Sequence, residues 1–366
     1  MAKAKRSGTG KQEKLSVSAV QEAVSKSGAT WEAGPTTLTA VAATEWPDFL
    51  GLVVTKEELA ATAAAIKAVT QLDAVRLAIS APAAIDWRNN GGNFITPIKN
   101  QNPCGSCVSF GTIATIESRM NIACRTPGTA RDYAEAFLFY CGCGNCCGTG
   151  WNFVPALDFC KNTGVAQETA FPYTPANQPC KPGVVPAFKI NGHTSVLSMA
   201  DRKSAIADRG PVVAGMAVYQ DFFAYRTGVY RHISGGLAGY HCVSVIGYDD
   251  AQSCWIAKNS WGTGWGEAGF FRIAYGDSGI DSQFAFYEPQ VSCAPSPVGD
   301  CERYLPVLRR VILLARTNAV LRRCLLQMCR GVRPLCPPQY QIIVNAVAAI
   351  LRRCPRYRLP FCRAIG

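Results

Sequence analysis

Hydrophobic and polar positions along the chain predict helices in its first half and strands in its second. The stretch 55–78, TKEELAATAAAIKAVTQLDAVRLA, predicts one helix with Thr55 as N-cap and Glu58 completing a capping box. Another helix is predicted from about Cys107 to Cys124. Short β-branched and aromatic runs predict strands at 212–219, 242–250, 254–261, 269–276 and 284–289. Helices first and strands later are typical of an α+β protein.

Charge separates the end of the chain from the rest. From residue 290 onward there are thirteen arginines, no lysine and two acidic residues, which accounts for +11 of the net charge of +12. Such a change in composition marks a separate module. Two amphipathic patterns, 302–329 and 337–354, predict helices on either side of the segment RPLCPPQ.

These shifts predict three regions. Residues 1–80 form an N-terminal extension, of which residues 1–30 are polar and expected to be mobile. Residues 81–290 form the main folded domain. Residues 291–366 form a basic, disulfide-rich helical module whose six cysteines from Cys301 onward allow 15 pairings.

Cysteine usage and the N-terminus give conflicting indications of compartment. Eighteen cysteines favour an extracellular or other oxidising compartment. However, the basic start MAKAKRSGTGKQEK leads into no apolar segment, so no signal peptide is visible. No apolar run has the eighteen or more residues of a membrane-spanning helix. The localisation therefore stays open.

Two cysteines in NQNPCGSCVSF (100–110) stand directly before a predicted helix. A zinc site at Cys104 and Cys107 would need a second regular pair, and CGCGNCCG (141–148) offers only irregular sets of ligands. A thioredoxin-like dithiol would need a βαβ setting, which the preceding residues do not supply. A structural disulfide is the simplest interpretation of Cys104. No metal or cofactor is expected.

Cys107 also has the attributes of a nucleophile. A thiol at the start of a helix lies in the positive end of the helix dipole, which favours the thiolate. Of the three histidines, His193 and His232 fall in exposed-looking segments, whereas His241 opens a fully apolar strand. Asn259 follows eighteen residues later and can orient an imidazole ring. Cysteine, histidine and asparagine in this order form a complete nucleophilic triad.

Three blocks of sequence make residues 81–290 resemble the papain family of cysteine peptidases. The blocks are DWRNNGGNFITPIKNQNPCGSC, HCVSVIGYD and KNSWGTGWGEAGFFRI. The histidine and asparagine follow Cys107 by 134 and 152 residues, close to the spacing of that family. The resemblance implies a two-lobed α+β fold, with a helical lobe and a β-barrel-like lobe, and the activity of a peptidase, expected to be an endopeptidase.

The resemblance also implies a role for each site residue. Cys107 is the nucleophile, and His241 is its ion-pair partner and proton shuttle. Asn259 holds the ring, and Trp261 covers the bond between them. The side-chain amide of Gln101 and the backbone N–H of Cys107 form the oxyanion hole. The residues implied for substrate binding are Gly148, Thr149, Gly150, Trp151, Gly215, Gly239 and Tyr240.

Further details follow from the same resemblance. Trp151, Gly215 and Gly239 line a pocket for Leu, Phe or Tyr as the second substrate residue before the cut. The implied disulfides are Cys104–Cys147 and Cys141–Cys180, with Cys104–Cys146 as the rival of the first. Cys143 and Cys146 are extra to the family pattern, and a local bridge between them is a further expectation. Departures from the family are Val108 in place of an aromatic residue and Cys242 after the histidine, which is expected to act as a small buried apolar residue.

Residues 1–80 stand where the family keeps an inhibitory prosegment. The predicted helix at 55–78, followed by the extended AISAPAA (78–84), suggests a docking element and then a strand that passes through the active-site cleft. The chain is therefore expected to be a zymogen.

The expected partners are a peptide or protein substrate and one ligand of the basic module. Basic amphipathic helices suit anionic lipid surfaces or an acidic protein, and the absence of lysine and of interleaved aromatic residues ranks nucleic acid lower. A monomer is expected. The alternative function is a catalytically weak papain-like scaffold that acts as a binding protein and is targeted to anionic surfaces by this module.

Overall fold

The computed structural model describes residues 14–73, 81–293, 305–331, 336–353 and 357–365. The chain divides into two compact units, Met1–Ser292 and Cys293–Gly366. Each unit has a hydrophobic core of its own.

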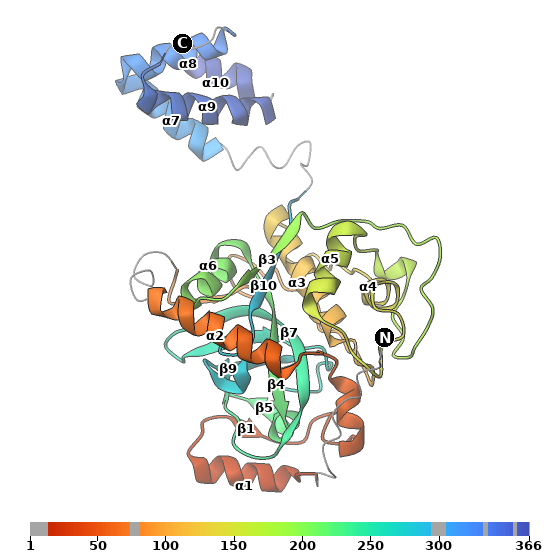
Figure 1. Cartoon of the computed structure of the whole chain (residues 1–366). Helices are drawn as coiled ribbons and strands as arrows, with labels where there is room; N and C mark the ends of the chain where they lie inside the picture. Colours follow the sequence, from red (N-terminus) through yellow and green to blue (C-terminus); the bar gives the residue numbers. More distant parts are fainter. Residues whose placement is uncertain (1–13, 74–80, 294–304, 332–335, 354–356, 366) are drawn as a thin grey trace. The chain divides into compact units, whose positions relative to one another are not determined.

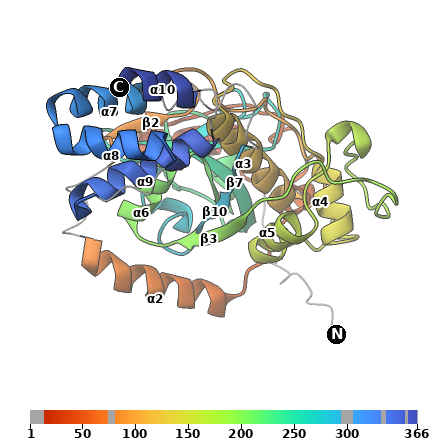
Figure 2. The same ribbon diagram turned by 90° about the horizontal axis from the view of Figure 1, so that it is seen from above.

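Helix α3 (Cys107–Cys124) is the central helix of the first unit, and its bounds are those predicted from the sequence. It stands between the sheet on one side and α4 (Glu135–Gly142) and α5 (Phe153–Asn162) on the other (Figures 1 and 2). Residues 107–121 of α3 are all buried. A helix that is covered on every side needs no single apolar stripe, which explains the mixed pattern of its sequence.

The large sheet of the first unit has the strand order β3-β10-β4-β7-β8-β9-β6, and β2 pairs with β7 off this path. All of these pairs are antiparallel except β6 with β9. The strands are β2 (Ala84–Asp86), β3 (Gly192–Val196), β4 (Val212–Tyr219), β6 (Val229–Tyr230), β7 (Leu237–Asp249), β8 (Cys254–Lys258), β9 (Phe270–Ala274) and β10 (Phe286–Gln290). Helix α6 (Met199–Arg209) packs on β7.

The five strands predicted from the sequence correspond to β4, β7, β8, β9 and β10. Strand β7 begins earlier than predicted, at Leu237, because the pairing of β4 with β7 continues through Tyr240 and Gly239. This extension places His241 inside a continuous strand, opposite Met216.

The N-terminal region is more ordered than its polar sequence predicts. The expectation of a mobile segment at residues 1–30 is wrong for residues 17–27, which form α1 (Val17–Ser27); residues 1–13 lie outside the described part of the chain. The side chain of Ser16 caps α1, and Val20 and Val24 are buried. Strand β1 (Glu32–Ala33) then pairs with β5 (Tyr225–Thr227), near the end of the unit where α1 lies (Figure 1). Tertiary contacts hold this segment.

Helix α2 (Lys56–Asp73) has the predicted N-terminus. The backbone N–H of Thr55 donates to Glu58 Oε2 over 2.8 Å, and the N–H of Glu58 donates to Thr55 Oγ1 over 3.1 Å. This reciprocal pair is the predicted capping box. The last residues of the predicted helix, 74–78, lie outside the described residues.

The second unit is a bundle of helices stapled by disulfides. Its described helices are α7 (Leu305–Thr317), α8 (Ala319–Cys329), α9 (Pro338–Arg353) and α10 (Arg358–Ile365). The single pattern predicted over 302–329 is wrong in one respect, because the helix breaks at Asn318, whose side chain caps α8. The disulfides Cys324–Cys336 and Cys329–Cys362 join the helices. Among the described residues, no helix is both long enough and apolar enough to span a bilayer.

Candidate active site

The start of α3 and the middle of β7 pack together and carry the two central side chains. Cys107 is the first residue of α3, is fully buried, and has a reduced thiol. His241 on β7 is also fully buried. The helix N-terminus supplies a positive partial charge at Cys107, which favours the thiolate.

Asn259 fixes the orientation of the imidazole ring. It follows the last residue of β8, and its Oδ1 lies 2.8 Å from Nε2 of His241. The same oxygen accepts the backbone N–H of Ser260 over 2.8 Å, which identifies it as the acceptor. An amide oxygen only accepts, so Nε2 carries the proton and Nδ1 is the basic nitrogen. In the described structure this Nδ1 is buried without a hydrogen-bond partner.

Burial sets the charge of His241 in this conformation. Desolvation lowers the pKa of His241 to about 4, and its hydrogen bond to Asn259 opposes that change only in part. The indole ring of Trp261 lies against the imidazole, with ring centroids 4.7 Å apart, and excludes water from this side. The ring is therefore neutral at pH 7.

Gln101 is held rigidly in the loop that precedes Cys107. Its Oε1 accepts the hydroxyl of Ser260 over 2.7 Å, and its Nε2 donates to the carbonyl oxygens of Cys104 and Phe49 over 2.9 and 3.1 Å. This amide is fully buried, so its geometry is fixed before any ligand arrives.

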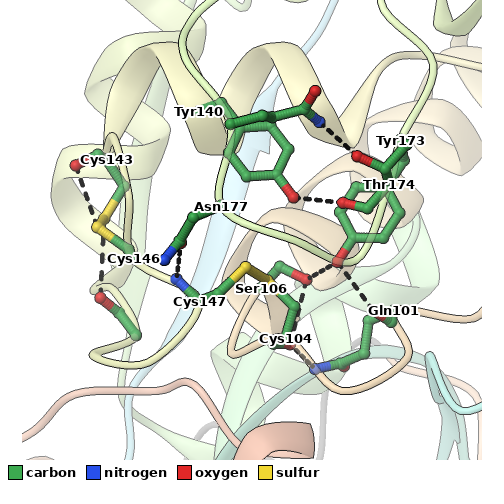
Figure 3. Close-up of a disulfide and its surroundings, with 12 residues drawn as sticks. Gln101, Cys104, Ser106, Tyr140, Cys143, Cys146, Cys147, Tyr173, Thr174 and Asn177 are labelled. Atoms are coloured by element: carbon green, nitrogen blue, oxygen red, sulfur yellow. Dashed lines mark hydrogen bonds between the residues drawn. A yellow bond between two sulfur atoms is a disulfide. The ribbon is translucent and has the colours of Figure 1, made fainter.

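A disulfide and a tyrosine support the loop before Cys107 (Figure 3). The bridge Cys104–Cys147 joins this loop to the segment before Trp151, and Gly105 N–H donates to the Cys147 carbonyl over 2.8 Å. The hydroxyl of Tyr173 donates to the Gln101 carbonyl and contacts Ser106 Oγ, both at 2.8 Å (Figure 3). The bridges Cys141–Cys180 and Cys143–Cys146 are also present, so the rival pairing Cys104–Cys146 is wrong.

Residues 49–53, here named the covering segment, lie over the site. The N–H of Gly51 donates to Cys107 Sγ over 3.2 Å. On one side Gly51 accepts from the N–H of Trp151 over 2.7 Å, and Val53 donates back to the Trp151 carbonyl over 2.8 Å. On the other side Leu52 N–H donates to the Tyr240 carbonyl over 3.2 Å. Backbone bonds therefore hold the segment between the two lobes.

The covering segment corrects a prediction. Residues 78–84 were expected to pass through the cleft, but the segment at the site is 49–53, which precedes α2. Residues 74–80 lie outside the described part, and Ala84 belongs to β2, paired with Asp249 at the far end of β7. The signal of this contact in the sequence is the glycine at position 51. A Cβ on Gly51 would overlap the carbonyl oxygen of Gly105, so only glycine fits this close approach.

Five of the seven residues predicted to bind substrate contact the covering segment. These are Gly150, Trp151, Gly215, Gly239 and Tyr240. The other two show no such contact: a Cβ at Gly148 would meet nothing within 4 Å, and Thr149 is exposed. The strand interaction thus begins at Gly150, whose missing Cβ leaves room for the carbonyl of Gly51.

Leu52 fills an apolar pocket that the sequence indicated only in part. A Cβ on Gly215 would stand 2.8 Å from Leu52 Cδ2 and 2.6 Å from Phe284. Gly239 instead faces Leu50, at 3.0 Å from the position of its Cβ. Phe284 was missed because it lies in the last predicted strand, far in sequence from the other site residues; its aromatic character was the only signal.

No metal-binding cluster occurs in the part of the chain that the structure describes. The four cysteines of CGCGNCCG, which the sequence analysis considered as zinc ligands, all form disulfides. Cys242 is buried beneath α3, where a Cβ on Gly111 would meet its Sγ at 2.6 Å, and burial raises its pKa well above the usual value. It is therefore a packed, unreactive thiol.

Comparison with known proteins decides the family. The sequence model described as "Papain family cysteine protease" matches residues 81–287. The chain belongs to the papain family. "Cysteine proteinase 2" of Entamoeba histolytica is 35% identical over 211 residues, which are 54% of this chain and 65% of that protein. "Ananain" of Ananas comosus is 34% identical over 200 residues, 53% of this chain and 56% of that protein. The chain thus spans less than two thirds of these relatives' length.

Solved papain-family structures agree with the two-lobed α+β fold. A recombinant stem bromelain precursor has 27% identity and a TM-score of 0.59, covering 76% of this chain and 89% of its own. A digestive procathepsin L2 from Tenebrio molitor has 26% identity and a TM-score of 0.61, covering 75% and 89%. Both matches are longer than residues 81–287, so the structural similarity extends beyond the family region.

Proposed function

We propose that this chain is the zymogen of a cysteine endopeptidase whose triad is Cys107, His241 and Asn259. The observation that carries the proposal is the placement of three buried side chains on elements that pack together. A reduced thiol starts a helix, and an adjacent strand carries a histidine that is oriented by an asparagine 2.8 Å away. Membership in the papain family supports the same reaction class.

The proposed reaction divides peptide hydrolysis into two steps. The thiolate of Cys107 attacks the peptide carbonyl carbon, and the carbonyl oxygen becomes an oxyanion that Gln101 Nε2 and the Cys107 N–H stabilise. Protonated His241 gives its proton to the leaving amine, which departs and leaves a thioester on Cys107. Neutral His241 then takes a proton from water, and the hydroxide that forms attacks the thioester and releases the acid.

The covering segment supports the assignment of residues 1–80 as an inhibitory prosegment. The group that it presents to Cys107 Sγ is the amide N–H of Gly51, not a carbonyl carbon, so the contact blocks the thiol without being open to attack. The carbonyl of Phe49 meanwhile accepts the Gln101 amide that would serve the oxyanion. The thiol of Cys107 and the amide of Gln101 are therefore both occupied by backbone groups that cannot react.

The pocket around Leu52 supports a preference for large apolar substrate side chains. Leu52 is 6% exposed between Gly215 and Phe284, and Tyr240 lies 5.9 Å from the ring of Phe284. A Leu, Phe or Tyr side chain of a substrate would bury comparable apolar area once the segment leaves. We assign this pocket to the second residue before the cut.

The decisive experiment compares two cysteines on neighbouring elements. Cys107→Ala is expected to abolish peptide hydrolysis after acid activation, and Cys242→Ala to keep most of it. A thiol-reactive epoxide should likewise label Cys242→Ala but not Cys107→Ala. Circular dichroism establishes that each variant is folded. Full hydrolysis by Cys107→Ala would overturn the proposal.

A further inference from the structure

Exposed apolar side chains are concentrated in the second unit. Six of the nine large hydrophobic residues that are exposed in the described part belong to it, including every leucine and isoleucine among them. The three in the first unit are all valines. The six are Val307 (48%), Leu313 (60%), Leu314 (47%), Val320 (45%), Ile342 (75%) and Leu359 (61%).

The same helices carry a dense positive charge. Residues 303–366 contain thirteen arginines and no aspartate, glutamate, lysine or histidine. The two acidic residues of the unit, Asp300 and Glu302, precede the helices and lie outside the described residues. No acidic side chain of the helices can therefore neutralise these arginines.

Arginine and leucine alternate on one face of α7. Its buried face consists of Leu308, Val311 and Ala315. Arg309, Leu313 and Arg316 follow one another at the spacing of one helix face and are all exposed. The exposed apolar residues of α7 therefore lie on its solvent face together with the arginines, and not on the face that packs in the core.

We propose that the second unit binds the surface of membranes rich in anionic lipids. Guanidinium groups pair bidentately with lipid phosphates, while the exposed leucines and isoleucine enter the boundary between headgroups and acyl chains. An acidic protein or a nucleic acid would use the arginines but would leave the exposed leucines without a function. The two disulfides keep the helices folded with these side chains outside.

The test uses the full-length chain carrying Cys107→Ser and co-sedimentation with lipid vesicles. Phosphatidylcholine vesicles with a minor fraction of phosphatidylserine are compared with pure phosphatidylcholine at low and high salt. Binding is expected only to the anionic vesicles, with release at high salt because the charge interaction is screened. Equal binding to both kinds of vesicle, or none to either, would overturn the proposal.

Two pairs of variants separate charge from apolar contact. Arg309→Gln with Arg316→Gln should weaken binding by about fivefold per arginine, and its matched control is Lys161→Gln with Lys189→Gln in the first unit. Leu313→Ser with Leu314→Ser should weaken binding several-fold at unchanged charge. Its control is the double substitution Val154→Ser with Val185→Ser, at two exposed valines of the first unit.

The control variants are expected to bind like the parent chain. Equal losses in the controls would show that general charge or general apolarity causes binding, and would overturn the proposal. Binding to poly-glutamate and to DNA is measured as well. A higher affinity for either of them than for vesicles, unchanged by the leucine substitutions, would also overturn the proposal because it would identify an acidic macromolecule as the ligand.

Discussion

Acidification should loosen the covering segment, residues 49–53, from the active site. The segment is bonded to Tyr240, which precedes His241 in sequence, and to Trp261, whose indole donates to the Phe49 carbonyl over 3.3 Å while lying against the imidazole. His241 is fully buried in this covered state. We expect water to reach the ring when the segment leaves, so that its ordinary protonation returns.

The size of the effect follows from the two pKa values of His241. In the covered state burial lowers the pKa from 6.5 to about 4. Without the Cys107 thiolate, as in the Cys107→Ser variant used below, both states hold the ring neutral well above pH 6.5, so pH has no influence there. As pH falls from 6.5 to 4, only the uncovered state takes up a proton, which stabilises it relative to the covered state. The limit is about 3 kcal/mol, and at pH 4.5 roughly 2.5 kcal/mol, or about 70-fold in the opening equilibrium.

Hydrogen exchange of the backbone amides of residues 51–53 measures this opening directly. The N–H groups of Gly51, Leu52 and Val53 are all donors in the covered state and exchange only when the segment leaves. The chain carries Cys107→Ser so that it does not cleave itself. After correction for the intrinsic effect of pH on exchange, protection should fall about 60-fold between pH 7 and pH 4.5.

The matched control adds His241→Gln, which keeps a side-chain amide for Asn259 but does not titrate. Its protection should change little over the same range, apart from effects of carboxylates elsewhere in the N-terminal region. If protection in the parent chain stays constant with pH, or falls equally with His241→Gln, the burial of this histidine does not control opening.

Three further substitutions, the first with a control, test separate contacts. Gly51→Ala should shorten the lag before peptide hydrolysis begins, because its Cβ overlaps Gly105 and weakens the covered state. The control Val53→Ala, at an exposed side chain, should leave the lag unchanged. An unchanged lag in both variants would contradict the close contact between Gly51 and Gly105. Thr55→Ala should lower the stability of the zymogen by about 0.5–2 kcal/mol through loss of the helix cap, as measured by thermal unfolding. Gln101→Ala should lower kcat of the activated enzyme by about 100-fold with little change in KM, and an unchanged kcat would remove its oxyanion role.

Local patterns predicted the elements whose residues interact mainly with near neighbours. The capping box at Thr55 and Glu58 is a four-residue motif, and α3 starts directly after the turn that ends at Ser106. The proposed triad was found for a different reason: catalysis restricts the residue type at each position, so its three blocks stay recognisable in sequence.

The sequence did not predict the covering segment or α1, because the residues that hold them lie far along the chain. Residues 49–53 have no periodic pattern, and most of the bonds that hold them come from backbone groups that every residue carries. Its partners, Trp151 and Tyr240, are about 100 and 190 residues away. Helix α1 buries only Val20 and Val24, so its sequence alone looked polar. Both segments are fixed by surfaces that exist only after the rest of the unit has folded.

The same contacts would keep the zymogen inactive in two ways. The covering segment occupies Cys107 Sγ and the amide of Gln101, which is a steric block. His241 is also fully buried while the segment is in place, and a ring with a pKa of about 4 is uncharged at neutral pH. The proposed chemistry needs an imidazolium to form the ion pair with the thiolate. Departure of the segment would therefore open the site and, by admitting water, allow the imidazolium to form in its ion pair with the Cys107 thiolate.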